Sequence, residues 1–209
     1  MEASHHLPIT TSSPRAAASF QAAVLSYLKY RLDTPVHLKA ALDADPMCAI
    51  AHCLSGYLVM LSYKKANVSI AEEALRNAML TVGNATAREQ AHAQALSAWI
   101  DGDLDRAIGI WEVILTDYPT DALAVRLSHF NNFWLGRPQA MRASLDRVVS
   151  RWNPSAAGYD VFLACRAFAH EECGDYEEAE RFGRESVELD PANVWGAHAV
   201  AHVMEMQGR

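Results

Sequence analysis

Two histidines and a glutamate near the end of the sequence, His198, His202 and Glu205, have the spacing of a metal site on a helix. Intervals of four and three residues place them on one helical face, where imidazole and carboxylate groups can share a metal ion. The metalloprotease signature has a glutamate directly after its first histidine, where this sequence has Ala199. Three interpretations stay open: a metal site, structural hydrogen bonding, and a polar lining that binds a peptide or small acid, which the sequence favours.

A second candidate is Arg126, which precedes Phe130 and Phe133 on the same predicted helix. In a partly desolvated groove with these rings and His92, its guanidinium could hold a carboxylate through two hydrogen bonds. The alternative is a salt bridge at the surface. Large aromatic residues at helical spacing more often pack between helices than form a recognition site, and we expect Trp111 in the core.

Familiar catalytic motifs are missing from the sequence, which contains no GxSxG segment, P-loop or Rossmann glycine set. The cysteines Cys48, Cys53, Cys165 and Cys173 match neither a CxxC redox pair nor a zinc-ribbon spacing. We therefore expect reduced thiols and no cofactor.

Composition and charge limit the partners of the chain. Its 209 residues are 51% hydrophobic and 21% charged, which suffices for a continuous core, and the net charge is −7. Because no basic stripe is present, nucleic acid is not an expected partner. The N-terminus lacks a signal-peptide pattern and no window reaches about 18 apolar residues, so we expect no membrane association and a cytoplasmic location.

An internal repeat is marked by glycines that recur at intervals of 34, 38 and 34 residues, namely Gly102, Gly136, Gly174 and Gly208. A helix-like segment and then a proline follow each of the first three. Two antiparallel helices need a turn with glycine's freedom in φ, and proline ends the second helix. This pattern is typical of the tetratricopeptide repeat, a helix-turn-helix unit that stacks on its neighbours.

The repeat divides the sequence into an N-terminal arm and a row of predicted helix pairs. Residues 1–14, rich in Ser, Thr and Pro, read as an extended or disordered arm, and residues 15–209 as one solenoid. The predicted segments are 15–46 and 47–84 as degenerate repeats, 85–119, 120–154 and 155–191 as repeats, and 192–209 as an unpaired first helix. An unpaired helix exposes an apolar face, so we expect self-association through 192–209, a missing partner segment or a truncated chain.

Several segments resemble the tetratricopeptide repeat protein 38 family. They are residues 7–13 before a helix at Phe20, residues 88–90, residues 118–121 and, as the most specific, Trp195 and residues 198–206. The similarity covers nearly the whole chain. It implies the repeat fold and relatives that continue beyond the last residue, but no established reaction.

The repeat class implies that first helices line a concave groove, so the turn glycines set which residues face a ligand. The expected groove residues are His92, Leu96, Trp99, Arg126, Phe130, Phe133, Ala164, Phe168, Glu171, His198, His202 and Glu205, with Cys53 and Tyr57 as further candidates. The histidines His52, His129 and His170 also fall on first helices, so protonation near pH 6 would change the charge of this side.

Taken together, the sequence predicts an all-α fold, a tetratricopeptide-like right-handed α-solenoid of antiparallel helix pairs. The predicted function is an interaction protein that binds a peptide, protein or small acidic ligand in its groove. The alternative is a metal- or small-molecule-dependent enzyme that uses the face of His198, His202 and Glu205.

Overall fold

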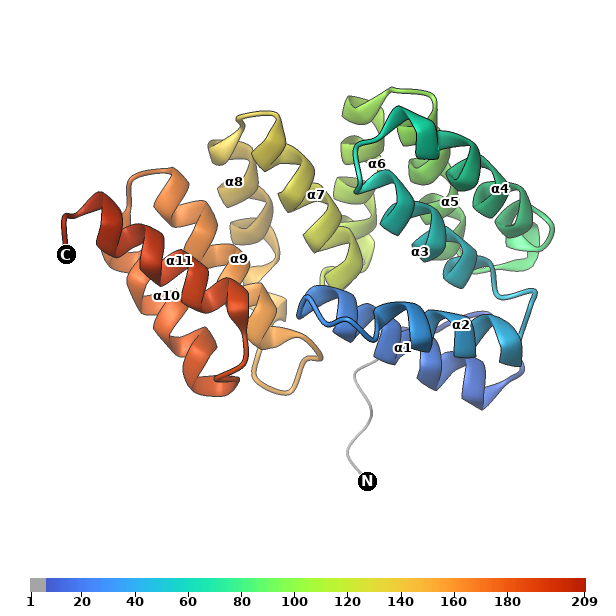
Figure 1. Cartoon of the computed structure of the whole chain (residues 1–209), viewed down its shortest axis with the longest axis horizontal. Helices are drawn as coiled ribbons and strands as arrows, with labels where there is room; N and C mark the ends of the chain where they lie inside the picture. The colour runs from blue at the N-terminus through green and yellow to red at the C-terminus, as the bar shows by residue number, and fades with distance from the viewer. Residues whose placement is uncertain (1–6) are drawn as a thin grey trace. The chain divides into compact units, whose positions relative to one another are not determined.

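The computed structural model describes residues 7–209, and these residues are all-helical, with no β-strand among them (Figure 1). Three short 3-10 helices lie at Lys65–Asn67, Val82–Asn84 and Val149–Arg151. The α-helices are α1 (Pro14–Leu28), α2 (Thr34–Ala44), α3 (Ala49–Met60), α4 (Val68–Met79), α5 (Ala87–Ile100), α6 (Leu104–Asp117), α7 (Ala122–Trp134), α8 (Pro138–Val148), α9 (Tyr159–Glu172), α10 (Tyr176–Leu189) and α11 (Val194–Met206).

The described chain forms two compact units. The N-terminal unit comprises Leu7–Tyr27 and Arg31–Tyr118, and the C-terminal unit comprises Leu28–Tyr30 and Pro119–Arg209. Two α-helices correspond to each of the five predicted paired segments, and α11 falls within 192–209, but α1 begins at Pro14, in the segment predicted as an arm. The tetratricopeptide type of stacking and the single solenoid over 15–209 stay predictions.

Glycines close the turns of three helix pairs. Gly102, Gly136 and Gly174 follow α5, α7 and α9 with φ angles of 83°, 66° and 79°, a left-handed region that L side chains rarely adopt. Asp103 follows the first of these glycines and accepts a hydrogen bond from the Arg106 N–H, which caps α6. Each turn thus ends one helix and starts an antiparallel partner within a few residues.

The core of the N-terminal unit contains part of the predicted groove. Tyr57 on α3 donates a hydrogen bond to the His92 carbonyl oxygen at 2.6 Å, and its hydroxyl accepts one from Trp111 Nε1 at 3.2 Å. Trp99 packs edge-on against Trp111 with ring centroids 5.5 Å apart. His92, Trp99 and Tyr57 are buried, as are Leu96 and Cys53, and α3 packs on α5. That these five residues line a ligand groove stays a prediction.

Residues 7–13 are not helical, and hydrogen bonds fasten them to the start of α5. Thr10 donates to the Glu89 carboxylate from its backbone N–H at 2.9 Å and from its hydroxyl at 2.6 Å. Thr86 donates to the same carboxylate from its backbone N–H at 2.9 Å, which forms a capping box. Arg88 donates to the Pro8 carbonyl oxygen at 3.0 Å. Residues 1–6, the rest of the predicted arm, lie outside the described residues.

The C-terminal unit has its core between α9, α10 and α11, which lie side by side in Figure 1. Leu163 and Ala167 of α9, Phe182 of α10 and Ala199 of α11 form one buried cluster. None of the helices within residues 7–209 is long and apolar enough to cross a membrane.

The hydrogen bonds of Thr10 and Thr86 to the Glu89 carboxylate, here called the Glu89 anchor, should make a contribution to stability that depends on pH. Burial would raise the pKa of the Glu89 carboxyl, but hydrogen bonds from Thr10 and Thr86 outweigh burial and hold this pKa below its usual value. The stabilisation is therefore present above the carboxyl pKa of the unfolded chain, about 4.3, and is lost as pH falls through the lower folded value.

Replacement of Glu89 by Gln should lower the free energy of unfolding at pH 7 by about 1–3 kcal/mol, since an amide cannot accept all these bonds. Urea titrations at pH 7 and pH 3 measure the change, which should shrink at the lower pH. The matched control is Glu72→Gln on the exposed side of α4, which should change stability by less than about 0.5 kcal/mol. A pH-independent difference for Glu89→Gln would contradict the anchor.

Candidate functional site: a pocket between α7, α9 and α11

A pocket of about 110 Å³ lies in the C-terminal unit between the helices α7, α9 and α11. Seven of the expected groove residues line it: Arg126, Phe130, Phe133, Ala164, Phe168, His198 and His202. The lining also includes His129 and Trp195. The sequence analysis placed His129 on a first helix but did not count it or Trp195 among the groove residues. The positions counted from the turn glycines include neither residue, and large aromatic residues were expected to pack between helices.

Caps and close contacts position the helices that carry these residues. Asp121 accepts a hydrogen bond from the Ala124 N–H and begins α7 one turn before Arg126. Asn193 accepts from the backbone N–H groups of Trp195 and Gly196 and begins α11. A Cβ on Gly196 would lie 2.7 Å from Ser186 Oγ, so only glycine allows α11 to approach α10 this closely. The approach holds Trp195 and His198 against α9.

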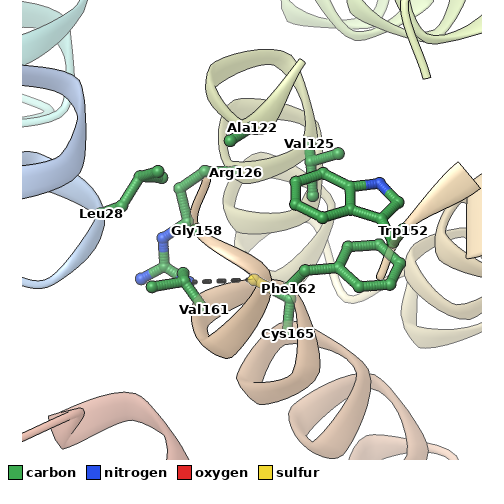
Figure 2. A pocket seen from close by; sticks show the side chains of 9 residues that line it. All are labelled: Leu28, Ala122, Val125, Arg126, Trp152, Gly158, Val161, Phe162 and Cys165. Carbon is green, nitrogen blue, oxygen red and sulfur yellow. Dashed lines mark hydrogen bonds between the residues drawn. The ribbon is translucent and has the colours of Figure 1, made fainter. Parts of the chain in front are cut away.

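Arg126 is a buried cation without a carboxylate partner among residues 7–209. Arg126 is only 6% exposed. Its Nη1 donates a hydrogen bond to the Cys165 Sγ at 3.8 Å (Figure 2). Among residues 7–209, no carboxylate oxygen forms an ion pair with this guanidinium. Burial raises the pKa of the Cys165 thiol, although the charge of Arg126 opposes this, so the sulfur is protonated and carries no counter-charge.

Aromatic rings replace the missing counter-charge only in part. The Arg126 guanidinium carbon lies 4.1 Å from the ring centroid of Trp195 and 5.1 Å from that of Phe130. Such cation–π contacts contribute about 2 kcal/mol when desolvated, less than the several kcal/mol that burial of an ion costs. The guanidinium therefore keeps a strong preference for an anion.

A second arginine in the same unit shows the ordinary arrangement. Arg166 on α9 lies over the Phe182 ring at 3.8 Å, as Arg126 lies over Trp195, but Asp146 is 3.7 Å from its guanidinium. The two arginines thus differ in whether the protein supplies the negative charge. This contrast makes Arg126 the candidate binding residue.

Arg126 also borders a second cavity, of about 10 Å³. Figure 2 shows this cavity with the stacked rings of Trp152 and Phe162, whose centroids are 4.4 Å apart, and with Leu28 near the guanidinium. This volume holds at most one water molecule, so the cavity is too small for a ligand. A ligand of Arg126 must enter through the larger pocket.

The histidines of the pocket add polar atoms, but the charge of an imidazole depends on its protonation, whereas that of Arg126 does not. Burial and the charge of Arg126 lower the pKa of His129 to about 3, so this imidazole is neutral at physiological pH. Its Nδ1 is buried without a hydrogen-bond partner. Burial and the neighbouring His202 lower the pKa of His198, and the two rings lie 4.2 Å apart. Arg126 is therefore the permanent cation of the lining.

Two predicted groove residues of the C-terminal unit lie outside the pocket lining. Glu205 is exposed and does not border this pocket, and its assignment to the ligand face stays a prediction. Glu171 is buried, and its Oε2 lies 3.9 Å from His202 Nδ1, too far for a hydrogen bond. Burial and Glu172 raise the Glu171 pKa, against a smaller effect of His202. Glu171 therefore lies next to His202 but does not line the pocket.

The proposed metal set does not assemble. No three His, Cys, Asp or Glu side chains within residues 7–209 are placed to hold a metal ion. The paired imidazoles instead share the wall around Phe168, whose ring centroid lies 6.0 Å from His198 and 6.1 Å from His202.

The outer face of α11 borders a separate, open groove of about 370 Å³ together with α10. Val200, Ala201 and Met204 supply its apolar lining, and Arg184 and Glu188 its charged lining. Val203 of the same helix is buried, whereas Val194 is exposed. Self-association through residues 192–209 stays a prediction.

No protein-family model matches the sequence. The chemistry of the pocket is thus the basis for its interpretation. A buried guanidinium, a neutral imidazole and a wall of aromatic rings can bind a small anion that carries an apolar group.

The unpaired charge predicts that Arg126 lowers stability in the free protein. Replacement by Met, which removes the charge and keeps much of the volume, should leave the free energy of unfolding unchanged or raise it by up to about 2 kcal/mol. The matched control, Arg166→Met, removes a charge that has a partner and should lower it by about 0.5–1 kcal/mol. Chemical denaturation of both variants measures the difference, and a loss above about 1 kcal/mol for Arg126→Met would contradict the unpaired charge.

Proposed function

We propose that this chain is a helical-repeat binding protein that holds the carboxylate group of a ligand on Arg126, in the pocket between α7, α9 and α11. The observation that carries the proposal is the burial of Arg126 without a protein carboxylate. The resemblance to the tetratricopeptide repeat protein 38 family agrees with a binding role, since repeat folds of this class present grooves to ligands.

The geometry supports a carboxylate for two reasons. A planar guanidinium matches the two oxygens of a carboxylate and can bind them through parallel hydrogen bonds. The ligand would also supply the charge that Asp146 supplies to Arg166. Binding at a preformed, partly dehydrated cation makes the interaction stronger than at the surface, because water competes less for either partner.

The other residues that line the pocket also have a role in binding such a ligand. Phe130 and Trp195 flank the guanidinium and exclude water from it. Phe133 and Phe168 meet edge-to-face with centroids 5.0 Å apart and supply an apolar wall for the rest of the ligand. A binding protein is therefore favoured over an enzyme that uses His198, His202 and Glu205, because Glu205 is not part of the pocket.

Calorimetric titration with benzoate tests this function. Benzoate should bind to the unchanged protein, and Arg126→Gln should weaken binding at least tenfold, as expected for the loss of about 1.5–3 kcal/mol from a charged hydrogen bond. Arg166→Gln is the matched control and should bind as the unchanged protein does, since its guanidinium lies outside the pocket lining.

Two outcomes count against the function. Failure of benzoate, butyrate and a peptide with a free C-terminus to bind at millimolar concentration would overturn it. Equal weakening by Arg126→Gln and Arg166→Gln would also overturn it, because binding would then reflect the overall charge of the protein.

A further inference from the structure

We infer that the ligand of this pocket is a small free acid with one carboxylate on an aromatic ring. The inference rests on the proposed function and adds the class of ligand. Charge, volume and wall chemistry each restrict that class, and they are independent of one another.

The charge of the lining suits a monoanion. Arg126 contributes one fixed positive charge, while His129 is held neutral by burial and by Arg126 itself. A phosphate ester carries about 1.5–2 negative charges at pH 7. Such a group would leave excess negative charge in a dehydrated pocket with no second fixed cation in its lining, whereas a carboxylate is balanced.

The volume restricts the ligand to about one ring. An engineered apolar cavity of about 150 Å³ binds benzene. The pocket here measures about 110 Å³, less than that cavity, so it has room for no more than one ring beside the group that Arg126 holds. A peptide C-terminus would bring a further amide group next to the aromatic walls, where the lining offers it few hydrogen-bond partners.

The walls favour an aromatic ring over a saturated one. Phe168 lies at the centre, within 6.0 Å of His129 and 5.0 Å of Phe133 by ring centroid, and both pairs are edge-to-face. A planar ring can add further edge-to-face contacts, each worth about 0.5–1.5 kcal/mol beyond its buried area. A cyclohexane ring of similar size lacks the charge distribution that these contacts require.

A buried polar atom in the lining also points to a ligand. His129 is 3% exposed, lines the pocket, and its Nδ1 has no hydrogen-bond partner. A neutral imidazole protonated at Nδ1 would donate a hydrogen bond to a carboxylate oxygen while Arg126 holds the group. The pocket therefore lacks both a counter-charge and a hydrogen-bond partner, and one carboxylate supplies both.

The test compares four probes by calorimetry: benzoate, cyclohexanecarboxylate, phenyl phosphate and an acetylated tripeptide that ends in phenylalanine. Benzoate should bind about 3–10-fold more tightly than cyclohexanecarboxylate, from one or two aromatic contacts. Phenyl phosphate and the tripeptide should bind at least about tenfold more weakly than benzoate. Phe168→Leu should bring the ratio between benzoate and cyclohexanecarboxylate close to one.

Trp134→Leu is the control for the aromatic wall, since Trp134 contacts Phe130 and Phe133 but is 60% exposed and outside the lining. It should keep the ratio of the unchanged protein. Thermal denaturation of both variants shows that each is folded. If a variant does not fold, the ratio of the benzoate and cyclohexanecarboxylate affinities in the unchanged protein still tests the ligand class.

The outcomes separate this inference from the function on which it rests. If cyclohexanecarboxylate, phenyl phosphate or the tripeptide binds as tightly as benzoate, and Arg126→Gln abolishes that binding, the ligand class is wrong and the function stands. If no probe binds, both are wrong. If benzoate is preferred and Phe168→Leu removes the preference, both are supported.

Discussion

The antiparallel helix pair closed by a left-handed glycine is the constraint on which the rest of the structure depends. Gly102, Gly136 and Gly174 allow the chain to reverse within a few residues, so each second helix packs beside its first. In the C-terminal unit this arrangement leaves the first helices α7, α9 and α11 as neighbours. The pocket is lined by the faces that these first helices share.

The proposed function depends on a charge that the C-terminal unit leaves without a carboxylate partner among residues 7–209. The protein surrounds Arg126 with Trp195, Phe130 and a neutral thiol, none of which carries a negative charge. Arg166 shows that the same unit can pair a stacked arginine with a carboxylate. An unpaired buried cation lowers the stability of the free protein. Such a cost is typical of binding sites, where the ligand supplies the opposite charge.

Much of the fold could be predicted from the sequence because its signals are local. Glycines and prolines mark helix ends through backbone sterics, so the helix pairs and the all-α class follow from their spacing. The start of α1 at Pro14 and the docking of Thr10 on Glu89 were not predicted. The docking depends on contacts between residues far apart in sequence, which periodicity does not contain. The start of α1 has a local signal instead, since Ser13 Oγ accepts a hydrogen bond from the Ala16 N–H.

The site was predictable only in part, for a related reason. The glycine register placed Arg126, Phe130, Phe133, Phe168, His198 and His202 on facing helices, and these residues meet in one pocket. The equivalent positions of α5, His92 and Trp99, are covered by Tyr57 from α3. Register shows which face of a helix a residue occupies, but the neighbouring side chains decide whether a cavity remains there.

A structure of the protein crystallised with 4-bromobenzoate tests the carboxylate site most directly, because anomalous scattering locates the bromine atom of the ligand. We expect a bromine peak beside Phe133 and Phe168. We also expect the carboxylate oxygens of the ligand about 2.7–2.9 Å from the guanidinium nitrogens of Arg126. A ligand bound with its carboxylate in solvent, or bromine found only outside this pocket, would contradict it.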